Sequence, residues 1–181
     1  MRNRVLELLR TDAYRQGQYT LSSGKQSEHY VNCKPVTLNG EGLYLISQML
    51  LECIEPGTAA VAGLTLGADP LVAGVALASY QNATAPDLEG IIVRKKSKGY
   101  GTNAWLEGNL PPKDSKIVIL EDVVTSGNSS IQAALRIRDV GYTVERVITI
   151  VDRQEDNEAY NNMESANLDL ISLFLLEELC E

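Results

Sequence analysis

Residues 117–129 read IVILEDVVTSGNS, and this stretch decides the fold. The apolar run 117–120 is typical of a buried strand, and Glu121 and Asp122 follow it directly. Small hydroxylated residues and a glycine then lead into a helix expected to begin at Ser129. Backbone N–H groups and hydroxyls at a helix N-terminus attract anions, and the helix dipole strengthens that attraction. The stretch therefore predicts a phosphate-binding loop between a strand and a helix.

The two carboxylates before this loop suit sugar chemistry. They can accept hydrogen bonds from sugar hydroxyls, and they place negative charge near a sugar carbon that becomes cationic. The alternative interpretation is a solvated strand end before an ordinary capped helix. The stretch is not a P-loop, because no Gly-Lys-Ser/Thr motif follows the glycine.

Short apolar strands alternate with helices along the chain. Strands are expected at residues 59–63, 90–94, 116–120, 144–151 and 168–175, and helices at 43–54, 71–80 and 129–140. This alternation predicts an α/β fold with a mostly parallel sheet flanked by helices. Right-handed crossovers bring the strand C-termini to one edge, where ligands bind. We expect one domain, residues 1–181, in which 41–181 form the core and 1–40, with a helix and two small strands, form a hood over that edge.

The amino-acid composition argues against several classes of function. The chain has 181 residues, 44% of them hydrophobic and 22% charged, and a net charge of −8. This acidity argues against nucleic-acid binding through a broad basic surface. Three cysteines, no CxxC pair and a single histidine predict no zinc site and suggest free thiols in a reducing compartment. The apolar stretches fall short of the roughly 20 residues that span a bilayer. We therefore expect a cytoplasmic protein with neither a nucleic-acid nor a membrane partner.

A basic segment stands out against this acidity. Arg94, Lys95, Lys96 and Lys98 place four cations within five residues, and glycines follow at positions 99 and 101. A mobile lid of this kind can bring positive charge to an anionic leaving group such as pyrophosphate. The alternative is a solvated hairpin tip.

The stretch 117–129 resembles the phosphoribosyl-pyrophosphate (PRPP) signature of type I phosphoribosyltransferases. Four further segments, at 21–32, 62–70, 93–108 and 151–155, occur in the order and spacing of the orotate phosphoribosyltransferase family. The resemblance covers nearly the whole chain. It implies the type I phosphoribosyltransferase fold and the transfer of a phosphoribosyl group from PRPP to orotate, giving orotidine 5'-monophosphate and pyrophosphate in de novo pyrimidine (UMP) biosynthesis. It also implies Mg²⁺ bound mainly through PRPP, without protein metal ligands, and a homodimer with shared active sites.

The resemblance also assigns residues. It implies catalytic roles for Glu121, Asp122 and Lys98. The implied PRPP-binding residues are Arg94, Lys95, Lys98, Tyr100, Glu121, Asp122, Val123, Val124, Thr125, Ser126, Gly127, Asn128 and Ser129. The implied orotate-binding residues are Lys25, Thr125 and Arg153. Arg94, Lys98 and Tyr100 would reach the neighbouring subunit's active site, whereas Lys95 would serve its own.

Two departures from the family pattern concern charge. Tyr100 occupies a position where the family usually has histidine, and a neutral phenol donates one hydrogen bond but carries no positive charge at neutral pH. The turn at 65–69 lacks the lysine of some members. Two other functions stay open: a phosphoribosyltransferase for a purine base, and a non-catalytic PRPP-sensing module. The basic segment and Arg153 argue against the first, and the absence of a basic helix-turn-helix pattern argues against the second.

Overall fold

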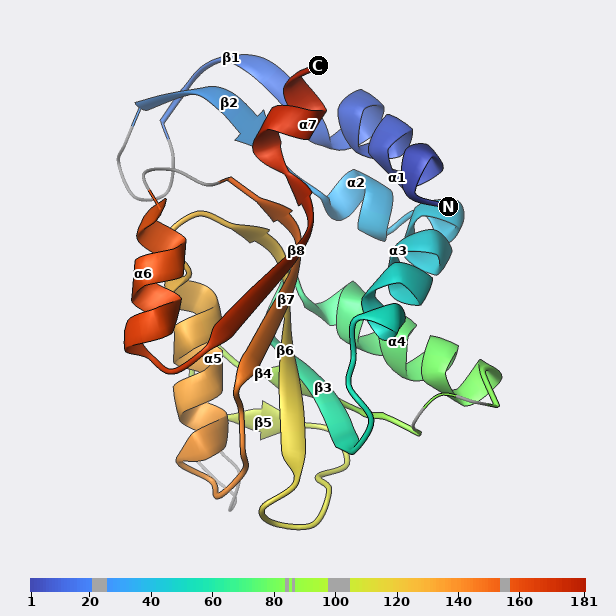
Figure 1. Cartoon of the computed structure of the whole chain (residues 1–181), viewed down its shortest axis with the longest axis vertical. Helices are drawn as coiled ribbons and strands as arrows, with labels where there is room; N and C mark the ends of the chain where they lie inside the picture. Colours follow the sequence, from blue (N-terminus) through green and yellow to red (C-terminus); the bar gives the residue numbers. More distant parts are fainter. Residues whose placement is uncertain (21–25, 84, 86, 98–104, 154–156) are drawn as a thin grey trace.

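A six-stranded sheet forms the centre of the computed structural model, which describes all residues except 21–25, 84, 86, 98–104 and 154–156. The strand order is β5-β4-β3-β6-β7-β8 (Figure 1). The strands are β3 (Thr58–Leu64), β4 (Glu89–Val93), β5 (Leu106–Glu107), β6 (Lys116–Val124), β7 (Arg146–Asp152) and β8 (Asp169–Leu175). All neighbours pair in parallel except β5, which runs antiparallel to β4. The expected α/β fold is confirmed.

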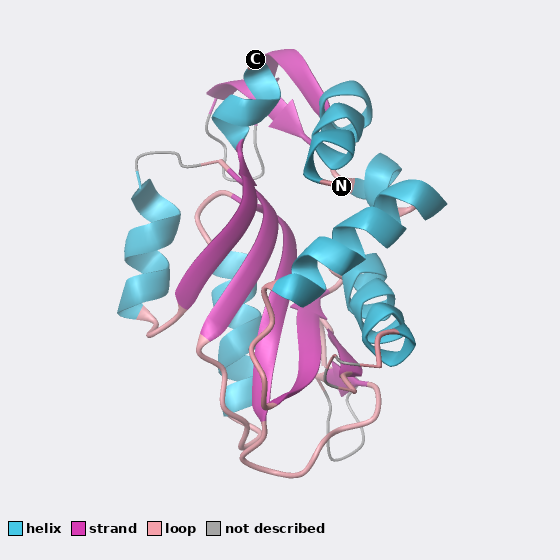
Figure 2. Ribbon diagram, turned by 45° about the vertical axis from the view of Figure 1, so that its right-hand side comes forward, coloured by secondary structure: helices cyan, strands magenta, loops and turns pink. Residues whose placement is uncertain are grey.

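Helices cover both faces of the sheet (Figure 2). Helices α3 (Gly40–Glu52) and α4 (Asp69–Gln81) pack on one face, and α5 (Asn128–Arg138) and α6 (Glu158–Ser165) pack on the other. Successive side chains of a strand point to opposite faces, so β6 serves both layers. Val118 and Leu120 belong to the apolar cluster under α3 and α4, whereas Ile117 and Ile119 belong to the cluster under α5.

The N-terminal part lies over the C-terminal edge of the sheet. It comprises α1 (Arg2–Leu8), the π-helical turn η1 (Leu9–Ala13), the antiparallel hairpin of β1 (Tyr14–Thr20) and β2 (Gln26–Val31), and α2 (Lys34–Thr37). The C-terminal helix α7 (Leu176–Cys180) packs against it. Arg10 donates two hydrogen bonds, of 2.6 and 3.0 Å, to the carbonyl of Glu178, and Arg2 forms a 2.7 Å ion pair with the same residue. We keep the name hood for residues 1–40, against which α7 packs.

Expected boundaries differ from the structure by up to four residues, and the difference at the end of β6 matters for the site. The strand predicted to end at Leu120 continues through both carboxylates to Val124. The cause is pairing that the β6 sequence alone does not reveal, because Glu121 lies opposite Thr149 of β7 and the ladder extends to Val124 and Asp152. Since adjacent strand residues point to opposite faces, Glu121 and Asp122 lie on different sides of the sheet.

Candidate active site

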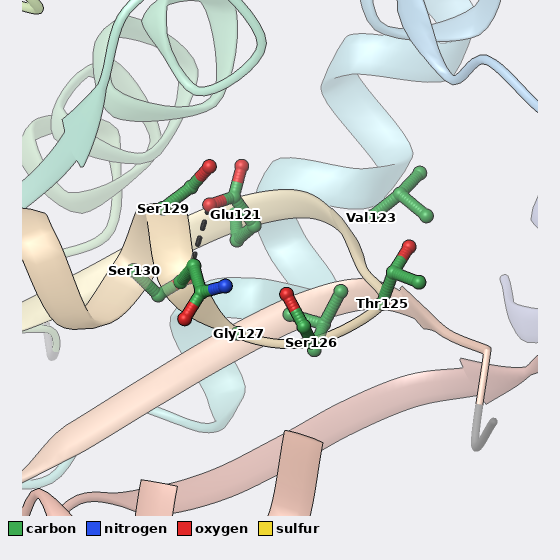
Figure 3. Close-up of a pocket in the computed structure, with 9 residues that line it drawn as sticks. Glu121, Val123, Thr125, Ser126, Gly127, Ser129 and Ser130 are labelled. Carbon is green, nitrogen blue, oxygen red and sulfur yellow. Dashed lines mark hydrogen bonds between the residues drawn. The ribbon is translucent and has the colours of Figure 1, made fainter. Parts of the chain in front are cut away.

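A polar pocket lies where β6 passes into α5. It has a volume of about 320 Å³ and is lined by Glu121 and by residues 123–130 (Figure 3). Gly127 precedes the helix with a φ of 78°, a left-handed conformation that favours glycine. The described residues provide no side-chain cap for this helix, which leaves its first N–H groups available to a ligand. The pocket can therefore bind an anion such as phosphate.

Helix α6 supports this loop from below. The side-chain amide of Asn162 donates a 2.9 Å hydrogen bond to the carbonyl of Ser126. A Cβ atom at Gly127 would lie only 2.7 Å from Cε of Met163. The glycine thus serves a close approach as well as a turn, and α6 fixes the position of the loop. No α6 helix was predicted from the sequence.

Glu121 points toward the pocket on the α5 side of the sheet. Its side chain is buried, and Ser130 Oγ donates a 2.9 Å hydrogen bond to Oε2 (Figure 3). Burial and the neighbouring Asp122 charge raise the pKa of Glu121 well above its usual range. This carboxyl group therefore retains its proton to a higher pH than an exposed glutamate does.

Asp122 points to the opposite side, toward the hood. Lys34 Nζ lies 3.3 Å from Oδ2, and the backbone N–H of Val123 donates a 3.1 Å hydrogen bond to Oδ1. A Cβ atom at Gly67 would lie 2.5 Å from the same Oδ1. Three segments that are far apart in the sequence thus meet at one carboxylate. They are the hood, the turn that follows β3, and strand β6 itself.

The base of the predicted lid lies at the end of β4. Arg94 Nη1 forms a 3.0 Å ion pair with Glu107 Oε1, and its backbone N–H donates to the carbonyl of Trp105. Arg136 of α5 donates hydrogen bonds to the carbonyls of Arg94 and Lys95. Lys25, Lys98 and Tyr100 lie outside the described residues.

Arg153 follows β7 at the same edge and lies under the hood. The side chain is buried, and its Nη2 donates to Ser27 Oγ at 2.9 Å and to the carbonyl of His29 at 3.1 Å. Its backbone N–H donates to the carbonyl of Val124, which places it beside Thr125. A cavity of about 490 Å³ opens here, lined by His29, Arg153, Leu176, Glu177, Cys180 and Glu181.

Known proteins resemble this chain over nearly its full length. No family model matches it. The orotate phosphoribosyltransferase of Thermosynechococcus vestitus is 45% identical over 179 residues, which span 99% of this chain and 93% of that protein. The chain belongs to the orotate phosphoribosyltransferase family. Membership makes it a pentosyltransferase and confirms the resemblance inferred from the sequence.

Solved structures of the family share its fold. Orotate phosphoribosyltransferase from Mycobacterium tuberculosis H37Rv superposes with a TM-score of 0.82 at 31% identity, covering 98% of both chains. A structure of that enzyme in complex with PRPP gives a TM-score of 0.78 at 29% identity, covering 99% of each chain. The type I phosphoribosyltransferase fold expected from the sequence is confirmed.

For this member of the orotate phosphoribosyltransferase family, the structure also shows contacts that sequence reasoning missed. Lys34, Gly67 and Arg136 each touch a residue that the sequence had singled out. The sequence carried little signal for them, because each contact joins elements that only the tertiary fold brings together. The described residues contain no group of three or more His, Cys, Asp or Glu side chains able to hold a metal ion. None of the described helices is long and apolar enough to cross a membrane.

Proposed function

We propose that this chain transfers the phosphoribosyl group of PRPP to orotate in the cytoplasm, as a step of UMP biosynthesis, with residues 1–181 acting as one domain. The observation that carries the proposal is the layout of one sheet edge. A helix N-terminal anion pocket, two carboxylates and a buried arginine meet there at the ends of β6 and β7. The relative whose structure contains PRPP supports the choice of donor.

The PRPP phosphate occupies the pocket of β6 and α5 in this proposal. Residues 125–129 donate backbone N–H and hydroxyl hydrogen bonds to the 5'-phosphate. Glu121 and Asp122 bind the ribose hydroxyls from the two sides of the strand. As pyrophosphate leaves, the anomeric carbon becomes cationic, and nearby negative charge stabilises it more than it stabilises the ground state.

Orotate binds under the hood. Arg153 is the planar cation that matches the planar carboxylate of orotate, and the contacts from Ser27 and His29 hold its guanidinium in place. Thr125 and Lys25 complete the orotate site. The position of Arg153 beside the phosphate pocket supports this arrangement, because the acceptor base must approach the anomeric carbon of PRPP.

The leaving group is neutralised by cations from the lid and by Mg²⁺. Arg94, Lys95 and Lys98 supply positive charge, and Tyr100 supplies one hydrogen bond. Mg²⁺ bound with PRPP would supply further positive charge for the diphosphate, since this ion often uses few protein ligands beside substrate phosphates.

A homodimer places the lid of one subunit over the site of the other. Exposed apolar side chains on α3 and α4 support association of this kind. Tyr44, Leu77 and Tyr80 are 58%, 58% and 80% exposed, and Tyr44 and Leu77 line one shallow apolar groove. Large apolar side chains gathered on a surface favour a protein interface.

The reaction is tested directly by the loss of orotate absorbance after PRPP and Mg²⁺ are added. Turnover with orotate and none with adenine, hypoxanthine or guanine supports the proposal. Faster turnover with a purine than with orotate would show that the acceptor is a purine base and not orotate. PRPP binding without turnover on any base would identify a non-catalytic PRPP sensor.

A further inference from the structure

Lys34 joins the hood to the carboxylate of β6. Its ammonium Nζ lies 3.3 Å from Oδ2 of Asp122, although the two residues are 88 positions apart in the sequence. The lysine side chain is 39% exposed and the aspartate side chain is 13% exposed. The ion pair therefore lies at the border between the site and solvent, where a ligand can reach the ammonium.

The backbone around Lys34 is held in place. Its N–H donates a 3.2 Å hydrogen bond to Oδ1 of Asn32, whose own N–H donates to the carbonyl of Ala13. The preceding Cys33 is fully buried, with its thiol 3.8 Å from the carbonyl oxygen of Asp122. The hood thus fixes the stem of Lys34 against β6 while the ammonium stays accessible.

The turn after β3 reaches the same carboxylate from another direction. A Cβ atom at Gly67 would lie 2.5 Å from Oδ1 of Asp122, so the backbone of this turn contacts the carboxylate. A glycine-containing turn after a strand presents backbone N–H groups to anions, so this turn is suited to backbone contact with pyrophosphate. Both carboxylate oxygens face the turn, since the same Cβ atom would lie 2.5 Å from Oδ1 and 2.6 Å from Oδ2; Oδ1 also accepts from the N–H of Val123, and Oδ2 also lies beside Lys34. Lys34 consequently lies near the junction of the ribose and diphosphate positions.

The positive charge of Lys34 matters at this position because PRPP must approach the Asp122 carboxylate. PRPP is strongly anionic, and an unpaired carboxylate at the site would repel it. We propose that Lys34 is a further substrate-binding residue, whose ammonium pairs with Asp122 until the ribose hydroxyls bind that carboxylate and then contacts the diphosphate. The inference rests on the proposed function, because it uses the assigned positions of ribose and diphosphate. It gives the hood a role in PRPP binding in addition to orotate binding.

The test compares Lys34→Met with Lys34→Arg. Loss of a hydrogen bond between charged groups corresponds to about a 10- to 100-fold effect. We expect Lys34→Met to weaken binding of Mg²⁺-pyrophosphate, measured by titration calorimetry, and to raise the KM for PRPP by about that factor. The KM for orotate should change by less than about threefold. Lys34→Arg should retain most of the wild-type binding because it keeps the charge.

Lys116→Met is the matched control. Lys116 begins the same strand at its opposite end and pairs with Glu55 and Glu145, and its side chain is 30% exposed. The Lys116→Met variant should bind pyrophosphate as wild type does and keep the wild-type KM for PRPP. Unaltered pyrophosphate binding in Lys34→Met overturns the inference. So does equal weakening of both substrates with a lower thermal midpoint and no rescue by arginine, because the residue is then structural.

The two proposals fail in different ways. If wild-type protein does not convert orotate but binds pyrophosphate in a Lys34-dependent manner, the proposed reaction is wrong and the anion contact stands. If wild-type protein converts orotate and Lys34→Met behaves like wild type, only the role of Lys34 is wrong.

Discussion

The guanidinium carbon of Arg136 lies 4.0 Å from the centre of the Trp105 ring. The same side chain donates hydrogen bonds to the carbonyls of Arg94 and Lys95. Helix α5 therefore contacts the chain at the start of the basic segment, Arg94 and Lys95, and again at Trp105, while its own N-terminus forms the phosphate pocket. Occupancy of that pocket and the position of the lid base thus depend on one helix.

Replacing Arg136 by methionine should loosen the base of the lid. A cation–π contact and the hydrogen bonds to two carbonyls are lost, so kcat/KM for PRPP should fall about tenfold. Steady-state kinetics measures this effect, and the fluorescence of Trp105, the single tryptophan of the chain, should change in the same variant.

Arg138→Met provides the comparison on the same helix. Arg138 also donates to backbone carbonyls, those of Val144, Ala166 and Asn167, away from the lid. It should lower the thermal midpoint with little effect on kcat/KM of the folded protein. Equal kinetic losses in both variants would contradict a specific role for Arg136.

Gly67→Ala should displace the Asp122 carboxylate. The new Cβ would lie 2.5 Å from Oδ1, so either the carboxylate or the turn must move. A displacement near 1 Å at a reacting centre can cost about 100-fold in rate, and kcat should fall accordingly while orotate binding persists. Gly40→Ala, with nothing within 4 Å of the new atom, should keep wild-type kcat. Wild-type turnover in Gly67→Ala would show that the turn yields without disturbing the site.

The pKa of Glu121 predicts how stability varies with pH. Its folded-state pKa is raised above the ordinary value of 4.5, so the folded protein binds this proton more tightly than the unfolded chain does. The free energy of unfolding should therefore fall as pH rises from about 4.5 toward the raised pKa. Glu121→Gln removes this loss and should be more stable than wild type at pH 8, by about 1 to 3 kcal/mol, with the difference vanishing near pH 4. Urea unfolding of wild type and Glu121→Gln at several pH values measures the free energy of unfolding of each protein.

Glu55→Gln should show the opposite sign. Hydrogen bonds from Lys116 and Arg146 hold the pKa of Glu55 below its usual range. A lowered pKa contributes stability at neutral pH that is lost as pH falls, so this variant should be less stable than wild type at pH 8 and similar to it in acid. If Glu121→Gln follows the Glu55→Gln pattern, Glu121 is ionised in the folded protein.

Local chemistry made part of this site predictable from the sequence. The run 117–129 combines strand, small-residue loop and helix start, and these signals depend only on neighbouring residues. The direction of each carboxylate was not predictable, because it depends on how far β7 pairs with β6. Helix α6 was missed since it buries only Ala159 and Met163 and so has a weak apolar stripe.

The hood shows the same limit more strongly. Its hairpin was expected as two short strands, whereas β1 and β2 span seven and six residues. β1 packs against η1, and Sγ of Cys180 in α7 lies 3.6 Å from Nδ1 of His29 in β2, contacts that a pattern of single residues does not report. Lys34 appeared as an ordinary basic residue for the same reason, because Asp122 is its neighbour only in the folded chain.

Arg153→Ala should raise the KM for orotate by about 10- to 100-fold and leave PRPP binding nearly unchanged. A charged hydrogen-bonding contact to the substrate carboxylate is lost and leaves its partner unpaired. Ser27→Ala controls for the hood, since it removes one hydrogen bond to the guanidinium and keeps the cation. Its effect on orotate should be smaller than that of Arg153→Ala. Equal weakening of both substrates by Arg153→Ala would make Arg153 structural.

The shared-site homodimer gives the sharpest prediction, because Lys98 and Asp122 would then belong to different chains in each active site. Lys98→Ala and Asp122→Asn homodimers should each be nearly inactive: one lacks a cation for the leaving group, and the other lacks the charge that stabilises the cationic ribose. In a mixed dimer one site receives both defects and the other receives none. Random exchange of subunits between the two inactive homodimers should therefore restore up to about a quarter of wild-type activity. Native mass spectrometry confirms that heterodimers have formed. Heterodimers without recovered activity would place Lys98 in the site of its own chain.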